Sequence, residues 1–166
     1  MSLIETGIVR LPKPNYKYIT TEEDARSALS EISNYPFFEL DTEATALDPY
    51  VAKMPLLQIG VPNKLFVFDM RSDIGMSSVH ISMFKPLLTD KKILKILQNA
   101  VFDMKLIKLK GGFYVENIYD TMLAEQLFNL GISARGADLA SLVLKYLGIT
   151  IDKEPRNTFG NYKQIF

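Results

Sequence analysis

The sequence predicts an α/β domain built on a mixed five-stranded sheet flanked by helices. Three β-forming segments follow one another with short links, at residues 37–41, 56–61 and 65–69, as expected for an antiparallel meander. Beyond residue 92, strand-like and helix-like segments alternate, which is typical of strands joined by helices. A chain of 166 residues that is 48% hydrophobic suits one domain, residues 1–166, with a sizeable core.

The first part of the chain is expected to add an edge strand and a helix. Residues 16–20 alternate in polarity, which predicts a short edge strand. Thr20 and Glu23 have the spacing of a capping box, so a helix should follow to about residue 34. Pro36 then separates this helix from the strand that begins at Phe37.

The later elements follow from apolar periodicity and from glycines that end helices. Gly111-Gly112 and Gly148 are typical helix stops. His80, the only histidine, is expected on the surface of its helix. The predicted elements are a helix at 77–88, a strand at 93–98, a helix at 101–110, a strand at 115–119, and helices at 120–129 and 137–147, followed by an irregular end from residue 149.

Composition narrows the class of protein. The chain has no cysteine, which excludes disulfides and thiolate metal sites. No apolar run approaches the roughly 18 residues of a membrane span, and Glu5 and Arg10 interrupt any signal peptide core. A cytoplasmic protein without a membrane partner is therefore expected. The net charge of zero neither favours nor excludes nucleic acid as a partner.

An acidic pair ends the strand that begins at Phe37. Side chains alternate along a strand, so Asp41 and Glu43 should point to the same side. Neighbouring carboxylates repel each other, and a divalent cation between them relieves the repulsion. Such oxygen ligands suit Mg²⁺ or Mn²⁺ better than zinc. The alternative is a strand that ends in a polar turn, which is the commoner meaning of an isolated Asp-x-Glu.

Two further acids lie where strands end and helices begin. Asn99 ends a strand, and Asp103 lies in the first turn of the next helix, where the helix dipole favours an acid. Asp120 starts another helix and can serve as its N-cap. Helix formation alone explains each of these acids, so the case for a site depends on their combination.

Taken together and in order, these motifs resemble the 3′–5′ exonucleases of the DEDD superfamily. That group has a ribonuclease H-like fold and includes ribonuclease D and the proofreading domain of bacterial DNA polymerase I. The resemblance covers about residues 17–160. The stretches that carry it are Asp41-Thr42-Glu43 with Leu47, Asn99-x-x-Phe102-Asp103, Tyr119-Asp120-Thr121-Met122-Leu123, Pro55-Leu56-Leu57-Gln58-Ile59, and the ribonuclease D-like stretch from Leu139 to Lys153.

The resemblance implies a two-metal nuclease that uses two Mg²⁺ or Mn²⁺ ions. The implied reaction is hydrolysis of phosphodiester bonds at single-stranded or frayed DNA 3′ ends, in proofreading or repair, releasing nucleoside 5′-monophosphates. A DNA polymerase is one candidate partner. Two alternatives stay open: a ribonuclease D-like enzyme that trims RNA 3′ ends, and a non-catalytic relative that binds nucleic acid.

The same resemblance assigns roles to the acids. Asp41 is expected to bridge both metals, and Glu43 to hold the metal that carries the attacking water. Asp103 is expected to support the second metal through water, because Mg²⁺ keeps several waters of its own. Asp120 is expected to be a helix cap near the site.

Three further residues are expected to bind the substrate. Leu47 would wedge against the terminal base. Asn99 and Phe102 would shape the pocket for the 3′ end.

Two features depart from the family pattern. The third motif, a Tyr or His followed by an Asp, is missing from residues 161–166, and Asp152 comes too early for it. A natural chain that continues past Phe166 is the expected explanation, and an inactive relative is the alternative. Glu39 shares the strand face of Asp41, and we expect it to pair with Lys95 rather than to bind metal.

Basic residues are frequent around the second motif. They are expected either to form a solvated helix face or to neutralise substrate phosphates. These residues are Lys91, Lys92, Lys95, Lys105, Lys108 and Lys110.

Overall fold

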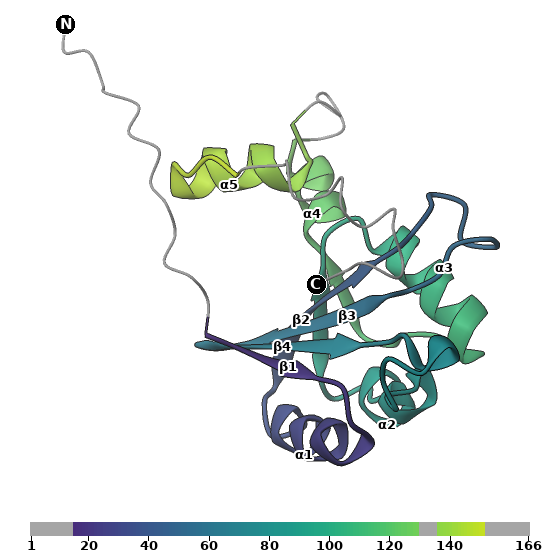
Figure 1. The fold of residues 1–166 in the computed structure, drawn as a ribbon. Coiled ribbons are helices and arrows are strands. Elements are labelled where there is room, and N and C mark those ends of the chain that lie inside the picture. The colour runs from purple at the N-terminus through teal and green to yellow at the C-terminus, as the bar shows by residue number, and fades with distance from the viewer. Residues whose placement is uncertain (1–14, 130–135, 152–166) are drawn as a thin grey trace, which may run out of the picture.

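A computed structural model describes residues 15–129 and 136–151, which form a six-stranded mixed sheet with helices (Figure 1). The α/β fold class is confirmed, and the sheet has one strand more than expected, because the edge strand and the short last strand both pair. The strand order is β1-β4-β3-β2-β5-β6. The strands are β1 (Tyr16–Ile19), β2 (Phe37–Glu43), β3 (Leu56–Val61), β4 (Lys64–Asp69), β5 (Leu94–Leu97) and β6 (Ile118–Asp120).

The predicted meander is present. Strands β2, β3 and β4 pair antiparallel, and Asp41 lies opposite Gln58. The other three strands pair parallel: β1 with β4, β5 with β2, and β6 with β5. As a result β2, which carries Asp41 and Glu43, lies inside the sheet between β3 and β5.

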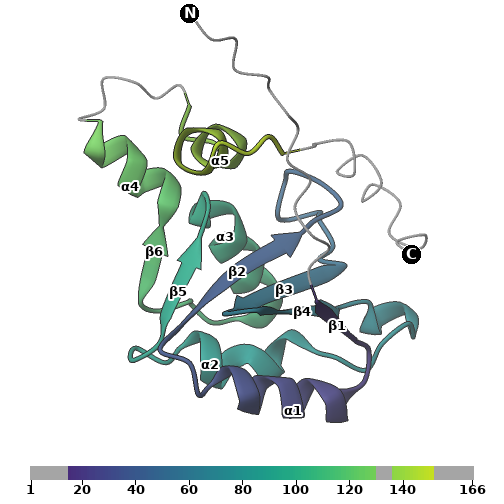
Figure 2. The same ribbon diagram turned by 90° about the vertical axis from the view of Figure 1, so that its left-hand side faces the viewer.

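The helices lie on both sides of the sheet. Helices α1, α2 and α3 share one hydrophobic core with β2 residues such as Phe38 and Leu40. Helices α4 and α5 extend from the β6 edge and lie on the side opposite α1 and α2 (Figures 1 and 2). The helices are α1 (Glu22–Ile32), α2 (Lys85–Leu88), α3 (Ala100–Gly111), α4 (Thr121–Phe128) and α5 (Leu139–Leu147), with short 3₁₀ turns η1 (Ser72–Ile74) and η2 (Ile81–Phe84).

The helix predicted at 77–88 is wrong in its first half. Ser78 receives the Glu22 N–H on its hydroxyl at 2.8 Å and donates its own N–H to the Thr20 carbonyl at 2.9 Å. These bonds hold the segment extended against the start of α1, since serine competes for backbone groups outside helices. Helical structure begins only at η2. His80 precedes that turn and is exposed, as expected for a surface residue.

Four helix starts, those of α1, α3, α4 and α5, also differ from the prediction by one or two residues, and side-chain caps explain the starts of α1 and α5. Thr21, rather than Thr20, caps α1, and its hydroxyl accepts the Asp24 N–H at 3.2 Å. Helix α5 begins after Asp138, whose carboxylate accepts the Ser141 N–H at 3.4 Å. In both cases the residue with the better-placed side-chain oxygen sets the boundary.

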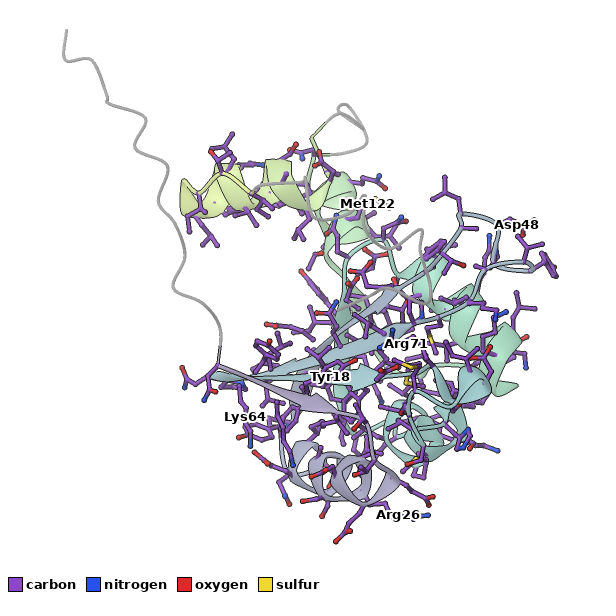
Figure 3. All side chains as sticks on the ribbon, viewed as in Figure 1. Tyr18, Arg26, Asp48, Lys64, Arg71 and Met122 are labelled. Atoms are coloured by element: carbon purple, nitrogen blue, oxygen red, sulfur yellow. The ribbon has the colours of Figure 1, made fainter. Side chains whose placement is uncertain are left out.

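A buried ion pair stabilises the end of β4. The side chains of Arg71 and Asp69 are only 3% and 2% exposed, and Arg71 Nη2 lies 2.6 Å from Asp69 Oδ2. The Tyr18 hydroxyl donates to the same carboxylate at 2.7 Å, and Figure 3 shows Tyr18 and Arg71 next to each other. Burial and the Asp69 carboxylate raise the pKa of Tyr18 to about 12.

Within residues 15–129 and 136–151, no helix combines the length and the apolar character needed to cross a bilayer.

Candidate active site

The central strand β2 places three acidic side chains on one face. Phe38, Leu40 and Thr42 are buried, so the residues between and after them face the other way. On that other face, Asp41 is exposed and Glu43 is half-buried. Glu39, Asp41 and Glu43 therefore line one side of the strand, as the alternation predicted.

A glutamine on the neighbouring strand orients one of these acids. Gln58 lies opposite Asp41 in the β2–β3 pairing. Its side-chain Nε2 donates to Glu43 Oε1 at 3.4 Å. The amide thus orients the Glu43 carboxylate without introducing a positive charge.

Asp103 reaches the same strand from α3. It lies in the first turn of the helix and is only 4% exposed. Its Oδ1 accepts the Thr42 N–H at 3.0 Å and the Thr42 hydroxyl at 2.6 Å. Thr42, between Asp41 and Glu43, therefore fastens the second motif to the first.

The electrostatics of Asp103 reflect this burial. The pKa of Asp103 is raised to about 6, chiefly by burial and further by the nearby charge of Asp41, while the hydrogen bonds from Thr42 act in the opposite direction. The ionised form of Asp103 is therefore less favourable in the folded protein than in the unfolded chain unless a positive charge lies close to it. A cation bound near Asp103 would offset that cost.

The β5–α3 junction positions the other residues of the second motif. Asn99 is exposed and has a left-handed backbone, with φ 58° and ψ 51°. Phe102 is half-buried and packs against the main core. The structure thus places Asn99, Phe102 and Asp103 together at the start of α3, at the end of the sheet where β2 and β5 end.

Asp120 caps α4, as predicted. Its Oδ1 accepts the N–H groups of Met122 at 2.8 Å and Leu123 at 3.3 Å. The same carboxylate also accepts the N–H groups of Asn99 and Ala100. This second pair of bonds was not anticipated.

Leu47 lies on the loop that follows β2. Its side chain is 90% exposed. The base of the loop is closed by the Thr45 N–H, which donates to the Lys53 carbonyl at 3.1 Å. Asp48, next to Leu47, lies far out on this loop (Figure 3). Leu47 is thus presented to solvent and does not form part of the folded core.

The predicted ion pair between Glu39 and Lys95 is wrong. In the β2–β5 pairing Lys95 lies opposite Phe38, so its side chain enters the opposite face from Glu39. Lys95 is completely buried, and its Nζ donates to the carbonyls of Asp90 and, at 3.0 Å, Ile93. Burial lowers the pKa of Lys95.

Glu39 instead lies over Gly60 of β3. A Cβ added at Gly60 would come within 2.5 Å of Glu39 Oε2. The glycine therefore makes room for the carboxylate, in keeping with glycines in strands that allow a close approach.

Three of the lysines around the second motif, Lys105, Lys108 and Lys110, are exposed or half-buried on α3, as expected for a solvated helix face, and the other three do not join them. Lys91 and Lys92 precede β5, at the opposite end of that strand from Asn99. Lys108 and Lys110 lie in the last turn of α3, and the Lys108 ammonium lies 4.0 Å from the centre of the Tyr114 ring. Neighbours in sequence become distant along a strand or a helix, at about 3.3 and 1.5 Å per residue.

The oxygen atoms of these acids are suitable ligands for a hard cation, but too few of the described acids lie together to complete a metal site. Asp41 and Glu43 offer carboxylate oxygens of the type that Mg²⁺ and Mn²⁺ prefer. Among residues 15–129 and 136–151, no three acidic or histidine side chains are grouped closely enough to ligate one metal ion. The region expected to hold the third motif, with Asp152 and residues 161–166, lies outside the described residues.

The sequence alone did not reveal two residues that orient these acids. Thr42 has a buried hydroxyl, and buried polar groups need partners, so its place between two acids was a usable signal. Gln58 could be assigned its contact only once the β2–β3 register was known.

Comparisons with known proteins agree with this arrangement. Residues 16–161 match a protein family described as 3′–5′ exonuclease. The exosome complex component 10 homolog of Drosophila melanogaster is 29% identical over 81% of this chain and 14% of its own length. DNA polymerase I of Aquifex aeolicus is 28% identical over 84% of this chain and 21% of its own length.

The solved structures show the same fold. The crystal structure of Escherichia coli RNase D, described as an exoribonuclease involved in structured RNA processing, superposes with a TM-score of 0.75 and 25% identity. The match covers 88% of this chain and 37% of that one, so the chain spans well under half the length of the relatives named here. With a family match over residues 16–161 and this shared fold, the chain belongs to the 3′–5′ exonuclease family that includes ribonuclease D and the exonuclease region of DNA polymerase I.

Proposed function

We propose that this chain provides the main part of the active site of a metal-dependent 3′–5′ exonuclease that removes nucleotides from nucleic acid 3′ ends. One observation carries the proposal. Asp41 and Glu43 lie on one face of the central strand, and the intervening Thr42 is bonded to Asp103 at 2.6 Å. A strand end or a helix start explains each of these acids singly, and the proposal rests on their combination at the end of β2.

The proposed roles are those that the family resemblance implies, and the geometry supports them through the contacts of Gln58 and Thr42. Asp41 and Glu43 would hold two Mg²⁺ or Mn²⁺ ions, and Asp103 would support one of them through water. When bound, such ions supply an activated water and cover the charge on the leaving oxygen. Gln58 keeps the Glu43 carboxylate oriented by donating to it at 3.4 Å. Thr42 holds the buried oxygen of Asp103.

The substrate end is assigned to the residues at the start of α3 and on the β2–β3 loop. Asn99 and Phe102 would form the pocket for the terminal nucleotide. Leu47, 90% exposed on its loop, would wedge against the terminal base. Contact with a base would remove apolar surface of this leucine from water.

We infer that RNA 3′ ends are the substrate, with DNA as the second candidate. The names of the relatives support RNA, since ribonuclease D of several bacteria and exosome component 10 of Homo sapiens are among them. The similarity to DNA polymerase I supports DNA, in proofreading or repair. An association with a DNA polymerase would accompany only the second candidate.

Digestion of matched RNA and DNA strands tests both the exonuclease activity and the preference for RNA. Single-stranded RNA and DNA of the same sequence, labelled at the 5′ end, are incubated with the natural full-length protein and Mg²⁺. We expect stepwise shortening from the 3′ end, faster on RNA and stopped by EDTA. Faster cleavage of DNA would overturn the RNA assignment. Binding without any metal-dependent shortening would favour the non-catalytic alternative.

Asp41→Ala tests the site itself. Loss of an acid that would hold the metals should lower turnover by about three or more orders of magnitude, while binding to single strands survives. Glu23→Ala removes an exposed acid from α1, on the opposite face, and serves as the matched control. Cleavage by Asp41→Ala at the rate of the control would refute the assignment.

A further inference from the structure

We propose that Asp120 is a positioning residue for the active site, because its carboxylate fixes the start of α3, and with it Phe102 and Asp103, in addition to capping α4. The expected effect on cleavage rests on the proposed function. The hydrogen bonds from Asp120 to backbone groups at the β5–α3 junction do not depend on it.

The hydrogen bonds of Asp120 exceed what a cap requires. The residue ends β6 and is 8% exposed. Its Oδ1 accepts N–H groups from Asn99 at 3.1 Å, Met122 at 2.8 Å and Leu123 at 3.3 Å. Its Oδ2 accepts the Ala100 N–H at 2.9 Å. One carboxylate therefore serves the first N–H groups of two helices.

Helix α3 depends on this outside partner. Its own N-cap, Asn99, has a left-handed backbone and makes no side-chain capping bond. The first N–H groups of a helix have no partner within the helix. Asp120 thus accepts the hydrogen bonds at the start of α3 that the Asn99 side chain does not accept.

The next residue strengthens the same junction. The Thr121 hydroxyl lies 3.1 Å from the Leu97 carbonyl oxygen and also contacts the side-chain oxygen of Gln98. Gln98 Nε2 in turn donates to the Ala137 carbonyl at 2.7 Å. Asp120 and Thr121 together therefore hold four consecutive residues, 97–100.

The junction connects directly to the site. Phe102 and Asp103 follow Ala100 within the first turn of α3. The Thr42 hydroxyl and N–H donate to Asp103 at 2.6 and 3.0 Å, and these bonds keep their geometry only while the start of α3 stays in place. A shift at Ala100 is transmitted along a rigid helix to both residues. A misplacement of about 1 Å can lower catalysis by about 100-fold.

Asp120→Asn separates the two roles of this carboxylate. Three of the four donors converge on Oδ1, so the amide oxygen will take that position and keep the α4 cap. Asparagine is as good an N-cap as aspartate. The amide NH₂ then replaces Oδ2 and faces the Ala100 N–H, donor against donor. Only the tie from Oδ2 to α3 is broken.

The kinetic test uses the full-length protein with a single-stranded oligonucleotide and Mg²⁺. We expect Asp120→Asn to lower kcat by about 10- to 100-fold, with a smaller change in KM. Asp120→Ser, whose hydroxyl can cap α4 but is too short to bridge both helices, should lower kcat similarly. Thr21→Ala removes the cap of α1 on the opposite face and should lower the Tm without changing kcat. If both Asp120 variants keep kcat within about twofold of wild type, the inference is overturned.

Amide hydrogen exchange of the metal-free protein gives a second result that needs no activity. In Asp120→Asn the Ala100 N–H should exchange about tenfold or more faster, while Met122 and Leu123 stay protected. Unchanged protection of Ala100 would overturn the inference. A wild-type protein that cleaves nothing would refute the proposed function, and the exchange result would still decide the role of Asp120 at the junction.

Discussion

Replacing Asp103 with asparagine should stabilise the metal-free protein above neutral pH and abolish exonuclease activity. The pKa of Asp103 is raised to about 6 in the folded protein, chiefly by burial. The unfolded chain has the ordinary pKa of 3.8. At pH 8 the folded protein must therefore keep an ionised acid in a site that favours the neutral form. Asparagine is neutral at every pH, and its oxygen can still accept the two bonds from Thr42.

The magnitude follows from the size of the shift. About two pKa units correspond to about 3 kcal/mol between the two protonation states. Because the folded pKa is the higher one, the stability from neutral Asp103 is fully present below about pH 4 and is lost as the pH rises through 6. Asp103→Asn should therefore gain about 3 kcal/mol at pH 8, or roughly 6–12 °C in Tm.

Urea unfolding at several pH values, in EDTA, measures this difference. We expect a gap between variant and wild type that is small at pH 4 and full at pH 8. Asp24→Asn is the control, since Lys17 and Thr21 lower the pKa of that exposed acid and its loss should not stabilise the fold. Added Mg²⁺ should narrow the gap, because only the wild type gains metal-binding energy from this acid. A variant no more stable than wild type at pH 8 would refute the reasoning.

Two further predictions concern other charged residues. Arg71→Ala should lower the free energy of unfolding by about 3–5 kcal/mol in denaturant, because Asp69, whose side chain is 2% exposed, would lose its ion-pair partner. Arg26→Ala breaks an exposed ion pair and should change the free energy of unfolding by less than about 1 kcal/mol. Equal losses for the two variants would contradict this account. Glu39→Gln should leave cleavage within about twofold of wild type, because the carboxylate lies over Gly60 of β3, whereas a loss of about 100-fold would make Glu39 a metal ligand.

Local pattern was sufficient to predict much of the fold. The alternation along residues 37–43 placed Asp41 and Glu43 on one face, because strand geometry depends only on the strand itself. Short links predicted the meander, and Gly112 marked the end of α3 with its left-handed backbone, φ 76°. These features all depend on residues that are near one another in the chain.

Contacts between distant segments could not be predicted. Lys95 was expected beside Glu39, but the parallel register with β2 puts it opposite Phe38, and one residue of register exchanges the two faces of a strand. The segment at Ser77 and Ser78 had helical periodicity, and bonds to Thr20 and Glu22 prevented the helix. In the same way, the second role of Asp120 depends on the parallel pairing of β6 with β5.

The bond between Thr42 and Asp103 also affects the order in which the molecule folds. It joins residues 61 positions apart, whereas Asp41 and Glu43 pair with β3 across a single loop. Closing a longer loop costs more entropy, so distant contacts tend to form after local ones. The acidic site should be completed late, after the meander has formed. Asp103→Asn should then slow unfolding and leave the folding rate almost unchanged, since contacts absent from the transition state act on the unfolding step. During synthesis, the meander that carries Asp41 and Glu43 would form first, and Asp103 would join it only after α3 has left the ribosome.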